Sequence, residues 1–349
     1  MIEPNIFVRL KDGVLLKCLI YVDNLLVSFP RLSAKAKTQA NEFLKAYGAK
    51  INLQVRGPPR KFLGLEVERD FANGTTLLTQ SNYIEQAYEK YCAGMITKDY
   101  KSPVHHGNLD KFRKLKPAET DAEKAAASDK PYMELMGVLI WSCMTHPEAQ
   151  YFVSSLCQLM AGWTVEAFEF GLGVLCYLYG ARKAGLLYQR LRKRNVAVYF
   201  DASWGSEPRP MTGYVIFFNG SPIAWAARKL KIVPLSSCES ETAAGVSALK
   251  TLTFLRNVLT FLKSNLELPV VMYTDNEACR LAAHNPGATQ RTRFFEIWMA
   301  ALRKHQLDRT IDIQWCSTSD MIADIMTKPL DKTTFLKHKA WLVYDPKMA

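Results

Sequence analysis

Asp201 is the residue with the clearest chemical potential, because it is an acid placed inside an apolar strand-like run. Residues 197–201 read AVYFD and alternate between the two faces of a predicted strand. Desolvating a carboxylate on a central strand is costly unless a compensating group lies near it, and a cation is the usual compensation. If Asp201 binds a cation, further acids are expected beside it.

Two more acids open a predicted helix. Ser236-Ser237 offers an N-cap, and Glu239 and Glu241 fall in the first turn. The apolar stripe of the helix passes through Ala244, three residues after Glu241, whereas Glu239 lies about 200° away from Glu241 at roughly 100° per residue. We predict that Glu241 faces the sheet. If the helix starts later, Glu239 takes that position instead.

The remaining candidate acids come later in the chain. Asp275 follows the β-branched run 268–273, and the carboxyl end of a buried parallel strand is where α/β folds usually build sites. The alternative is that Asp275 caps the helix that follows. Asp324 lies beside the apolar face of a terminal helix predicted over 317–328, on which Asp320 is a cap or first-turn charge.

The elements around these acids follow a definite order. Three strand-like runs, predicted to be antiparallel, occupy 197–201, 212–219 and 222–227, and the helix with Glu241 comes next. A strand ending near Asp275, two helices, a strand at 311–317 and the terminal helix complete the order. The pattern predicts an α/β domain with a mixed five-stranded sheet flanked by helices.

This order resembles the ribonuclease H fold, specifically the copia-type domain that follows reverse transcriptase. The residues that carry the resemblance are FDASW at 200–204, SSCESE at 236–241, YTDN at 273–276 and IADIMTKP at 322–329. The resemblance implies that four acids are catalytic and bind metal: Asp201, Glu241, Asp275 and Asp324.

The implied chemistry suits these residue types. Hydrolysis of a phosphodiester needs an activated water and a neutralised leaving oxygen, and two Mg²⁺ ions can supply both. Mg²⁺ prefers carboxylate oxygens, and Mn²⁺ is expected to substitute for it. The expected substrate is the RNA strand of an RNA–DNA hybrid, recognised through its 2′-hydroxyls.

Several residues are candidates for contact with that hybrid. They are Asn276, Arg228, Lys229, Arg291 and Arg293. The resemblance also implies that Gly213-Tyr214 and the run Arg291–Arg293 stand in places typical of the family. The family usually has a histidine just after the last of these, where this chain has Phe294-Phe295, so a substrate role for that histidine is not carried over.

The first part of the chain contains two predicted hairpins and a helix. Residues 13–28 form apolar strand-like runs that meet at Asp23-Asn24, and a simple hairpin turn explains that pair. A helix over 33–48 and a hairpin over 61–80 follow. These pieces resemble the second half of a reverse transcriptase palm, with Tyr21–Asn24 as the catalytic turn and Phe62–Gly64 as the primer-grip strand.

Two departures from that family argue against polymerisation. Asn24 replaces the second aspartate of the turn, and the chain starts just before this hairpin, without the upstream strand that carries another metal-binding aspartate. Polymerisation needs two cations held by several carboxylates. Asp23 is therefore interpreted as a reverse transcriptase remnant, and we expect no DNA synthesis by this chain alone.

Residues 81–190 are predicted to be mostly helical, with a charged, loop-like stretch over 98–130. In the family that the chain resembles, this region is the thumb, and a plain helical bundle is the alternative. Arg182-Lys183 and the basic run 190–194 then lead into the strand of Asp201. A solvated linker and a phosphate contact both explain these charges.

Composition limits the class of protein. The formal charge of +12 over 349 residues favours a polyanionic partner, although a merely basic protein is the alternative. The eight cysteines form no CxxC pair, which is typical of reduced thiols. No apolar run approaches the roughly 20 residues of a membrane span. The expected location is intracellular, in the cytoplasm or the nucleus.

The sequence thus predicts a multi-domain α/β protein in four parts: a partial reverse transcriptase palm (1–80), a helical thumb or connection (81–190), a ribonuclease H domain (191–335) and a C-terminal tail (336–349). The predicted function is cleavage of RNA–DNA hybrids by a retrotransposon-derived ribonuclease H. Two alternatives are an inactive nucleic-acid-binding remnant and a structural partner of other polymerase polyprotein chains.

Overall fold

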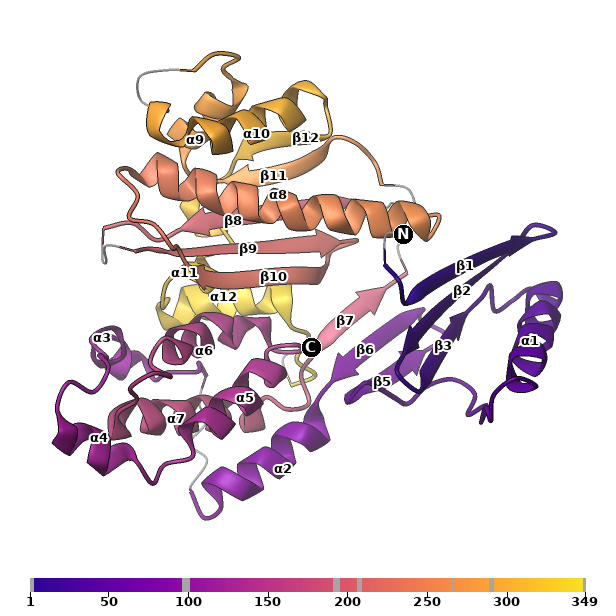
Figure 1. The fold of residues 1–349 in the computed structure, drawn as a ribbon, viewed down its shortest axis with the longest axis horizontal. Coiled ribbons are helices and arrows are strands. Elements are labelled where there is room, and N and C mark those ends of the chain that lie inside the picture. The colour runs from indigo at the N-terminus through magenta and orange to yellow at the C-terminus, as the bar shows by residue number, and fades with distance from the viewer. Residues whose placement is uncertain are drawn as a thin grey trace. The chain divides into compact units, whose positions relative to one another are not determined.

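The computed structural model describes residues 3–95, 101–190, 195–205, 209–264, 266–288 and 292–347. The chain divides into two compact units, one of residues 1–63 and 252–266, the other of residues 64–251 and 267–349. Their helices and strands are labelled in Figure 1.

The first unit is built on a three-stranded antiparallel sheet. Its strands are β1 (Ile6–Lys11), β2 (Val14–Tyr21) and β3 (Asn24–Ser28), in the order β1-β2-β3. The predicted hairpin is confirmed, but its tight turn consists of Val22 and Asp23 rather than Asp23 and Asn24, because Asn24 already pairs with Tyr21. Helix α1 (Ala34–Gly48) begins after Ser33, whose Oγ accepts a hydrogen bond from the Ala36 N–H. Strand β4 (Lys61–Phe62) is the last element of residues 1–63.

The second unit begins with strands and helices that precede its main sheet. Strand β6 (Thr75–Thr79) pairs antiparallel with both β5 (Leu65–Asp70) and β7 (Leu186–Gln189). Between β6 and β7 lie the helices α2 (Ser81–Cys92), α3 (Leu109–Arg113), α4 (Asp121–Ala127), α5 (Tyr132–Ser142), α6 (Gln150–Cys157) and α7 (Val165–Gly180). The stretch 98–130 is therefore not simply a loop, because a capping box between Thr120 and Glu123 starts α4 within it.

The main sheet has five strands in the order β10-β9-β8-β11-β12. They are β8 (Val196–Ala202), β9 (Met211–Phe218), β10 (Ser221–Lys229), β11 (Val270–Thr274) and β12 (Ile311–Trp315). Strands β8, β9 and β10 are antiparallel, whereas β11 pairs parallel with both β8 and β12. The predicted mixed five-stranded sheet is confirmed.

Helices lie on both faces of this sheet (Figure 1). On one face, α8 (Ser237–Phe261) packs closely on β8, and a Cβ added to Gly245 would lie 3.0 Å from the Phe200 ring. On the other face, α11 (Asp324–Thr327) rests on β9, where a Cβ at Gly213 would lie 2.5 Å from the Met326 Cβ. Glycine at position 213 thus permits the close approach of α11.

Helices α9 (Glu277–His284) and α10 (Glu296–Leu307) lie beside β11 and β12. Helix α12 (Lys332–Leu342) includes part of the segment predicted as a C-terminal tail, and its Phe335 and Leu342 are buried. These two side chains share one hydrophobic core with the helices of 81–190 and with β9 and β10. The four-part division predicted from the sequence stays a prediction.

The sequence predicts one continuous terminal helix over 317–328, and this prediction is wrong. The structure has a 3-10 turn at Thr318–Asp320, a break at Met321 and then the short helix α11. Met321, Ile322, Ile325 and Met326 are all at most 3% exposed, and the break lets this apolar set be buried within a short segment. Burial thus overrides the helical continuity of the sequence. Among the described residues, no helix combines the length and apolarity that crossing a membrane requires.

Candidate metal centre

Asp201 lies near the end of β8 and is 3% exposed. Its neighbour across the β8–β9 ladder is Gly213, the glycine on which α11 rests. This packing brings Thr327, at the end of α11, to Asp201, and the Thr327 hydroxyl donates a hydrogen bond to Asp201 Oδ2. The carboxylate is therefore held by a residue 126 positions later in the chain.

The two glutamates at the start of α8 have different surroundings. Glu239 belongs to the helix cap, since its N–H donates to Ser236 Oγ and its Oε2 accepts from the Leu235 N–H at 2.7 Å. Glu241 reaches the sheet instead. Its Oε1 accepts from the Ala202 N–H at 3.2 Å, and its Oε2 accepts from Thr274 Oγ1 at 3.5 Å.

Asp275 follows β11 and is half-buried. It does not cap α9, because the Asn276 side chain accepts the Cys279 N–H at 2.9 Å and fills that role. Asp275 Oδ2 instead accepts from Thr318 Oγ1 at 2.9 Å. The capping interpretation thus applies to Asn276, and Asp275 is left facing the other acids.

Three of the predicted acids converge. One carboxylate oxygen each from Asp201, Glu241 and Asp275 lie within 4.8 Å of one another. Within the described residues, this is the one group of three or more acids, histidines or cysteines close enough to hold a metal ion. The three acids come from β8, α8 and the end of β11, so the site depends on how these elements pack.

Burial and mutual repulsion change the acidity of the cluster. Burial, followed by the charges of Asp201 and Asp275, raises the pKa of Glu241 well above its usual range. Burial and the charge of Asp201 also raise the pKa of Asp275, although the hydrogen bond from Thr318 opposes the shift. The negative charges of these three carboxylates repel one another, and a bound divalent cation would relieve that repulsion.

Asp324 lies beside this group of three, and a lysine occupies one of its oxygens. Lys328 Nζ is 2.8 Å from Asp324 Oδ1, and the two side chains are 38% and 4% exposed. Burial, followed by the charge of Asp201, raises the pKa of Asp324 to about 8, although Lys328 opposes the shift. Asp324 is therefore an electrostatic neighbour of the acids, with its own counter-ion.

The remaining candidate residues lie outside this cluster. Arg228 and Lys229 are exposed at the end of β10, and Arg293 is exposed in a 3-10 turn before α10. Asn276 caps α9, and Arg291 lies outside the described residues. Asp23 is in the first unit, at the exposed β2–β3 turn, where its Oδ1 accepts from the Asn24 side chain at 2.8 Å.

Sequence reasoning missed the groups that hold the acids. Thr327 contacts Asp201, and Lys328 contacts Asp324. Thr318 contacts Asp275, and Thr274 contacts Glu241. The four-residue spacing from Asp324 to Lys328 is typical of an ion pair on a helix and was the available local signal. The threonine contacts had no local signal, because each joins distant parts of the chain.

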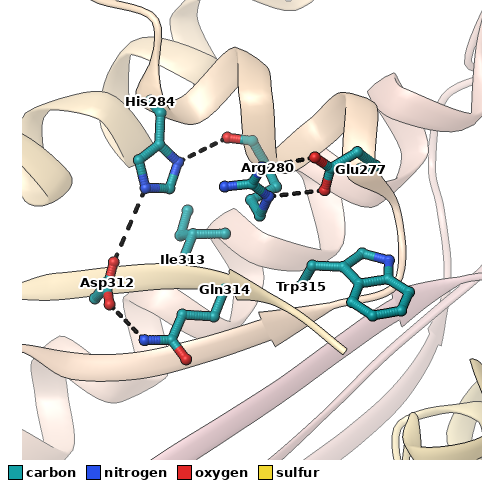
Figure 2. Close-up of a pocket in the computed structure, with 7 residues that line it drawn as sticks. All are labelled: Glu277, Arg280, His284, Asp312, Ile313, Gln314 and Trp315. Carbon is teal, nitrogen blue, oxygen red and sulfur yellow. Dashed lines mark hydrogen bonds and ion pairs between the residues drawn. The ribbon is translucent and has the colours of Figure 1, made fainter. Parts of the chain in front are cut away.

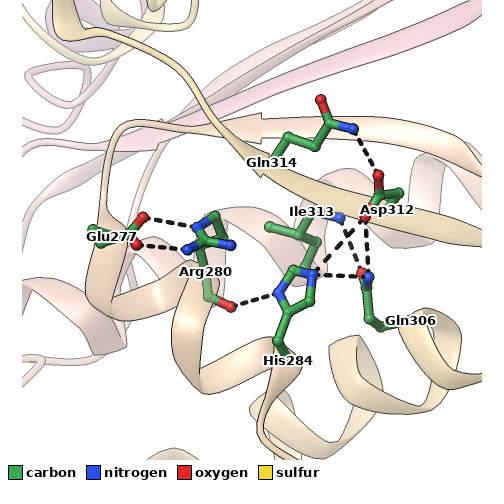
Figure 3. A network of polar contacts seen from close by, with 7 residues as sticks. All are labelled: Glu277, Arg280, His284, Gln306, Asp312, Ile313 and Gln314. Atoms are coloured by element: carbon green, nitrogen blue, oxygen red, sulfur yellow. Dashed lines mark hydrogen bonds and ion pairs between the residues drawn. The ribbon is translucent and has the colours of Figure 1, made fainter.

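A surface recess beside α9 and β12 contains none of the four acids (Figure 2). Arg280 pairs with Glu277 at 2.6 Å, and His284 Nδ1 donates to the Arg280 carbonyl oxygen at 2.9 Å. Gln306 Nε2 donates to Asp312 at 3.1 Å, and its Oε1 accepts the outward Ile313 N–H at 2.9 Å (Figure 3). This network covers the edge of β12, where an open edge would invite pairing with another chain.

Comparison with known proteins gives long matches of low identity. No family model matches the chain. It is 26% identical over 340 residues to the retrovirus-related Pol polyprotein from transposon RE1 of Arabidopsis thaliana, covering 95% of this chain and 22% of that protein. For transposon RE2 of the same plant, identity is 24% over 344 residues, with the same coverage. The chain spans about a fifth of the length of these relatives.

Among solved structures, LC11-RNase H1 in complex with RNA/DNA hybrid is similar with a TM-score of 0.30 and 14% identity, over 38% of this chain and 94% of that one. The mixed five-stranded sheet with its flanking helices, described above, is an α/β fold. The two plant relatives named above are retrovirus-related Pol polyproteins from transposons.

Proposed function

We propose that this chain is a metal-dependent ribonuclease H that hydrolyses the RNA strand of RNA–DNA hybrids and is joined to a reverse transcriptase segment that does not polymerise. The convergence of Asp201, Glu241 and Asp275 carries the proposal. Homology to retrotransposon Pol polyproteins supports it, because those relatives span nearly the whole of this chain.

The donor set fits divalent metal ions. It consists of carboxylate oxygens, which Mg²⁺ prefers, and Asp201, Glu241, Asp275 and Asp324 would hold two such ions. The ions would supply an activated water and charge neutralisation at the leaving oxygen. The Ala202 N–H and the hydroxyls of Thr318 and Thr327 orient the carboxylates and restrict their rotation.

The proposed partner is an RNA–DNA hybrid. The formal charge of +12 favours binding to a phosphate backbone. Arg228 and Lys229 are candidates for phosphate contact, since both are exposed at the end of β10. Arg228 pairs with Thr212, which in turn pairs with Ala202, the residue after Asp201. Arg293, on the exposed turn before α10, is a further candidate.

DNA synthesis is not expected from these residues. The turn that resembles a polymerase site carries Asp23 beside Asn24. Asn24 supplies no second carboxylate, and its side-chain amide donates a hydrogen bond to Asp23. Within the described residues, Asp23 belongs to no group of acids that could hold a cation. Primer extension above background in the presence of Mg²⁺ or Mn²⁺ would contradict this part of the proposal.

The cleavage activity can be tested with a hybrid labelled on its RNA strand. We expect the chain to release RNA fragments in the presence of Mg²⁺, and Asp201→Asn or Asp275→Asn to reduce the rate at least roughly 100-fold, because each removes a carboxylate from the cluster. Asp308→Asn is the matched control, since Asp308 pairs with Lys304 on the surface and lies outside the cluster.

The other outcomes favour the alternatives. Binding of the hybrid with no cleavage by the wild-type chain would establish a nucleic-acid-binding remnant. A stable complex with another polymerase chain, without activity alone, would favour a structural partner. Equal cleavage by wild type and by both cluster variants would mean that a contaminating nuclease acts, and the proposal would fail.

A further inference from the structure

Among the described residues, Lys328 is the basic side chain that pairs with one of the four candidate acids, Asp324. It follows α11 directly, and its Nζ is 2.8 Å from Asp324 Oδ1, one helical turn earlier. Asp324 is almost fully buried, whereas Lys328 retains 38% exposure. The ammonium group thus reaches from the surface to a buried carboxylate.

Lys328 is a cation among acids, because a lysine amine is protonated at neutral pH. The negative charges of Asp201, Asp324 and Asp275 all act on it. Among the described residues, it is the cation in contact with one of the four acids. Its contact is to Asp324, the acid that does not join the group of three.

From this arrangement we propose that Lys328 is a positioning residue that competes with a divalent cation for Asp324. In the metal-free chain its ammonium group holds the carboxylate and offsets repulsion within the cluster. With divalent cations bound, Asp324 would join Asp201, Glu241 and Asp275 in holding them, and its ion pair with Lys328 would be broken or weakened. This inference rests on the proposed function, because it assumes that the cluster is a metal site.

Competition of this kind has a definite consequence for affinity. A positive charge a few ångströms from a cation site lowers the affinity of the site for the cation. Lys328 therefore stabilises the metal-free protein and weakens metal binding. A residue with only a structural role would stabilise the protein without weakening metal binding.

The test is calorimetric binding of Mn²⁺ alone, at one mildly alkaline pH, to the full chain and to Lys328→Met. Methionine keeps the length of the side chain and removes its charge. We expect Lys328→Met to bind Mn²⁺ roughly tenfold more tightly, because a competing unit charge is removed. An equal or weaker affinity would overturn the inference.

Lys337→Met is a matched control. Lys337 makes an ion pair of the same length, 2.8 Å, with Asp320, four residues before Asp324, and Asp320 is not one of the four acids. We expect its removal to leave Mn²⁺ affinity unchanged. A comparable increase in affinity would mean that general surface charge is responsible rather than competition at Asp324.

A double-mutant cycle with Asp324→Asn tests the route of the effect. In that background, Lys328→Met should change Mn²⁺ affinity by about twofold or less, and should no longer lower the thermal midpoint of the metal-free protein. Equal changes in both backgrounds would overturn the inference. If the wild-type chain binds no Mn²⁺, the proposed metal site fails, and the metal-free midpoints still decide whether Lys328 acts through Asp324.

Discussion

Each carboxylate of the candidate site has a hydrogen-bond donor that lies elsewhere in the chain. Ala202 donates to Glu241, Thr318 to Asp275 and Thr327 to Asp201. These contacts orient oxygens that repel one another, so a cation would meet a partly ordered set of ligands. The geometry of the site therefore depends as much on these donors as on the acids.

A buried histidine predicts acid sensitivity. His338 is fully buried in α12, and neither ring nitrogen has a hydrogen-bond partner. Burial and the nearby Lys337 lower its pKa to about 4, with a smaller contribution from Lys328, while Asp320 and Asp331 oppose the shift. Because the unfolded chain binds this proton first, His338 reduces the free energy of unfolding as the pH falls from about 6.5 to about 4.

The measurement compares wild type with His338→Leu by denaturant unfolding over that pH range. The wild type should lose roughly 3 kcal/mol more than the variant between the two ends of the range. Above neutral pH this term is absent, so the difference in stability between the two proteins should be constant there. Parallel pH profiles throughout would contradict the prediction.

At the scale of elements, α11 is too short to be stable alone. A helix of four residues gains little from its own hydrogen bonds, so tertiary packing must hold it. That packing occurs at Gly213 on β9, directly across the ladder from Asp201. The position of α11 thus places Thr327 and Asp324 at the site.

Gly213→Ala should disturb both stability and the site. The added Cβ would lie 2.5 Å from Met326 Cβ and 2.9 Å from Thr327 Cγ2, so α11 must move away from β9. We expect a loss of about 1–3 kcal/mol in the free energy of unfolding, together with weaker Mg²⁺ binding.

Denaturant unfolding and Mg²⁺ titration measure the two effects. Gly173→Ala is the control, because Gly173 lies in α7 with no atom within 4 Å of its added Cβ. Alanine favours a helix over glycine by up to about 1 kcal/mol, so this control should be neutral or stabilising. Equal stability of Gly213→Ala and wild type would show that β9 tolerates the side chain and that the argument is wrong.

At the scale of the whole molecule, all seven tryptophans lie in the second compact unit, which also contains the candidate metal centre. Tryptophan fluorescence therefore reports on that unit. Because a cation that binds only the folded state stabilises it by mass action, Mg²⁺ should raise the fluorescence-detected unfolding midpoint.

Metal removal tests this expectation directly. The midpoint should rise with Mg²⁺ concentration, return to its original value after addition of a chelator, and stay constant in Asp201→Asn. A rise of the same size in Asp201→Asn would locate the cation elsewhere, and no rise in the wild type would speak against a metal site in this unit.

Much of the fold was predictable because its signals are local. The strands around Asp201 are runs of apolar and aromatic residues bounded by turn residues. The apolar stripe of α8 placed Glu241 rather than Glu239 toward the sheet, as the structure also has it. The helix phase was sufficient here because Glu239 and Glu241 are on one rigid element whose period is known.

Other features depended on distant contacts. Asp275 and Asn276 can each cap a helix, and the hydrogen bond from Thr318 to Asp275 distinguishes them. The break at Met321 follows from burial in a shared core, which overrides local helical periodicity. Neither the contact of Thr327 with Asp201 nor the fit of α11 on Gly213 has a signature in sequence, because both arise from close packing between segments more than 100 residues apart.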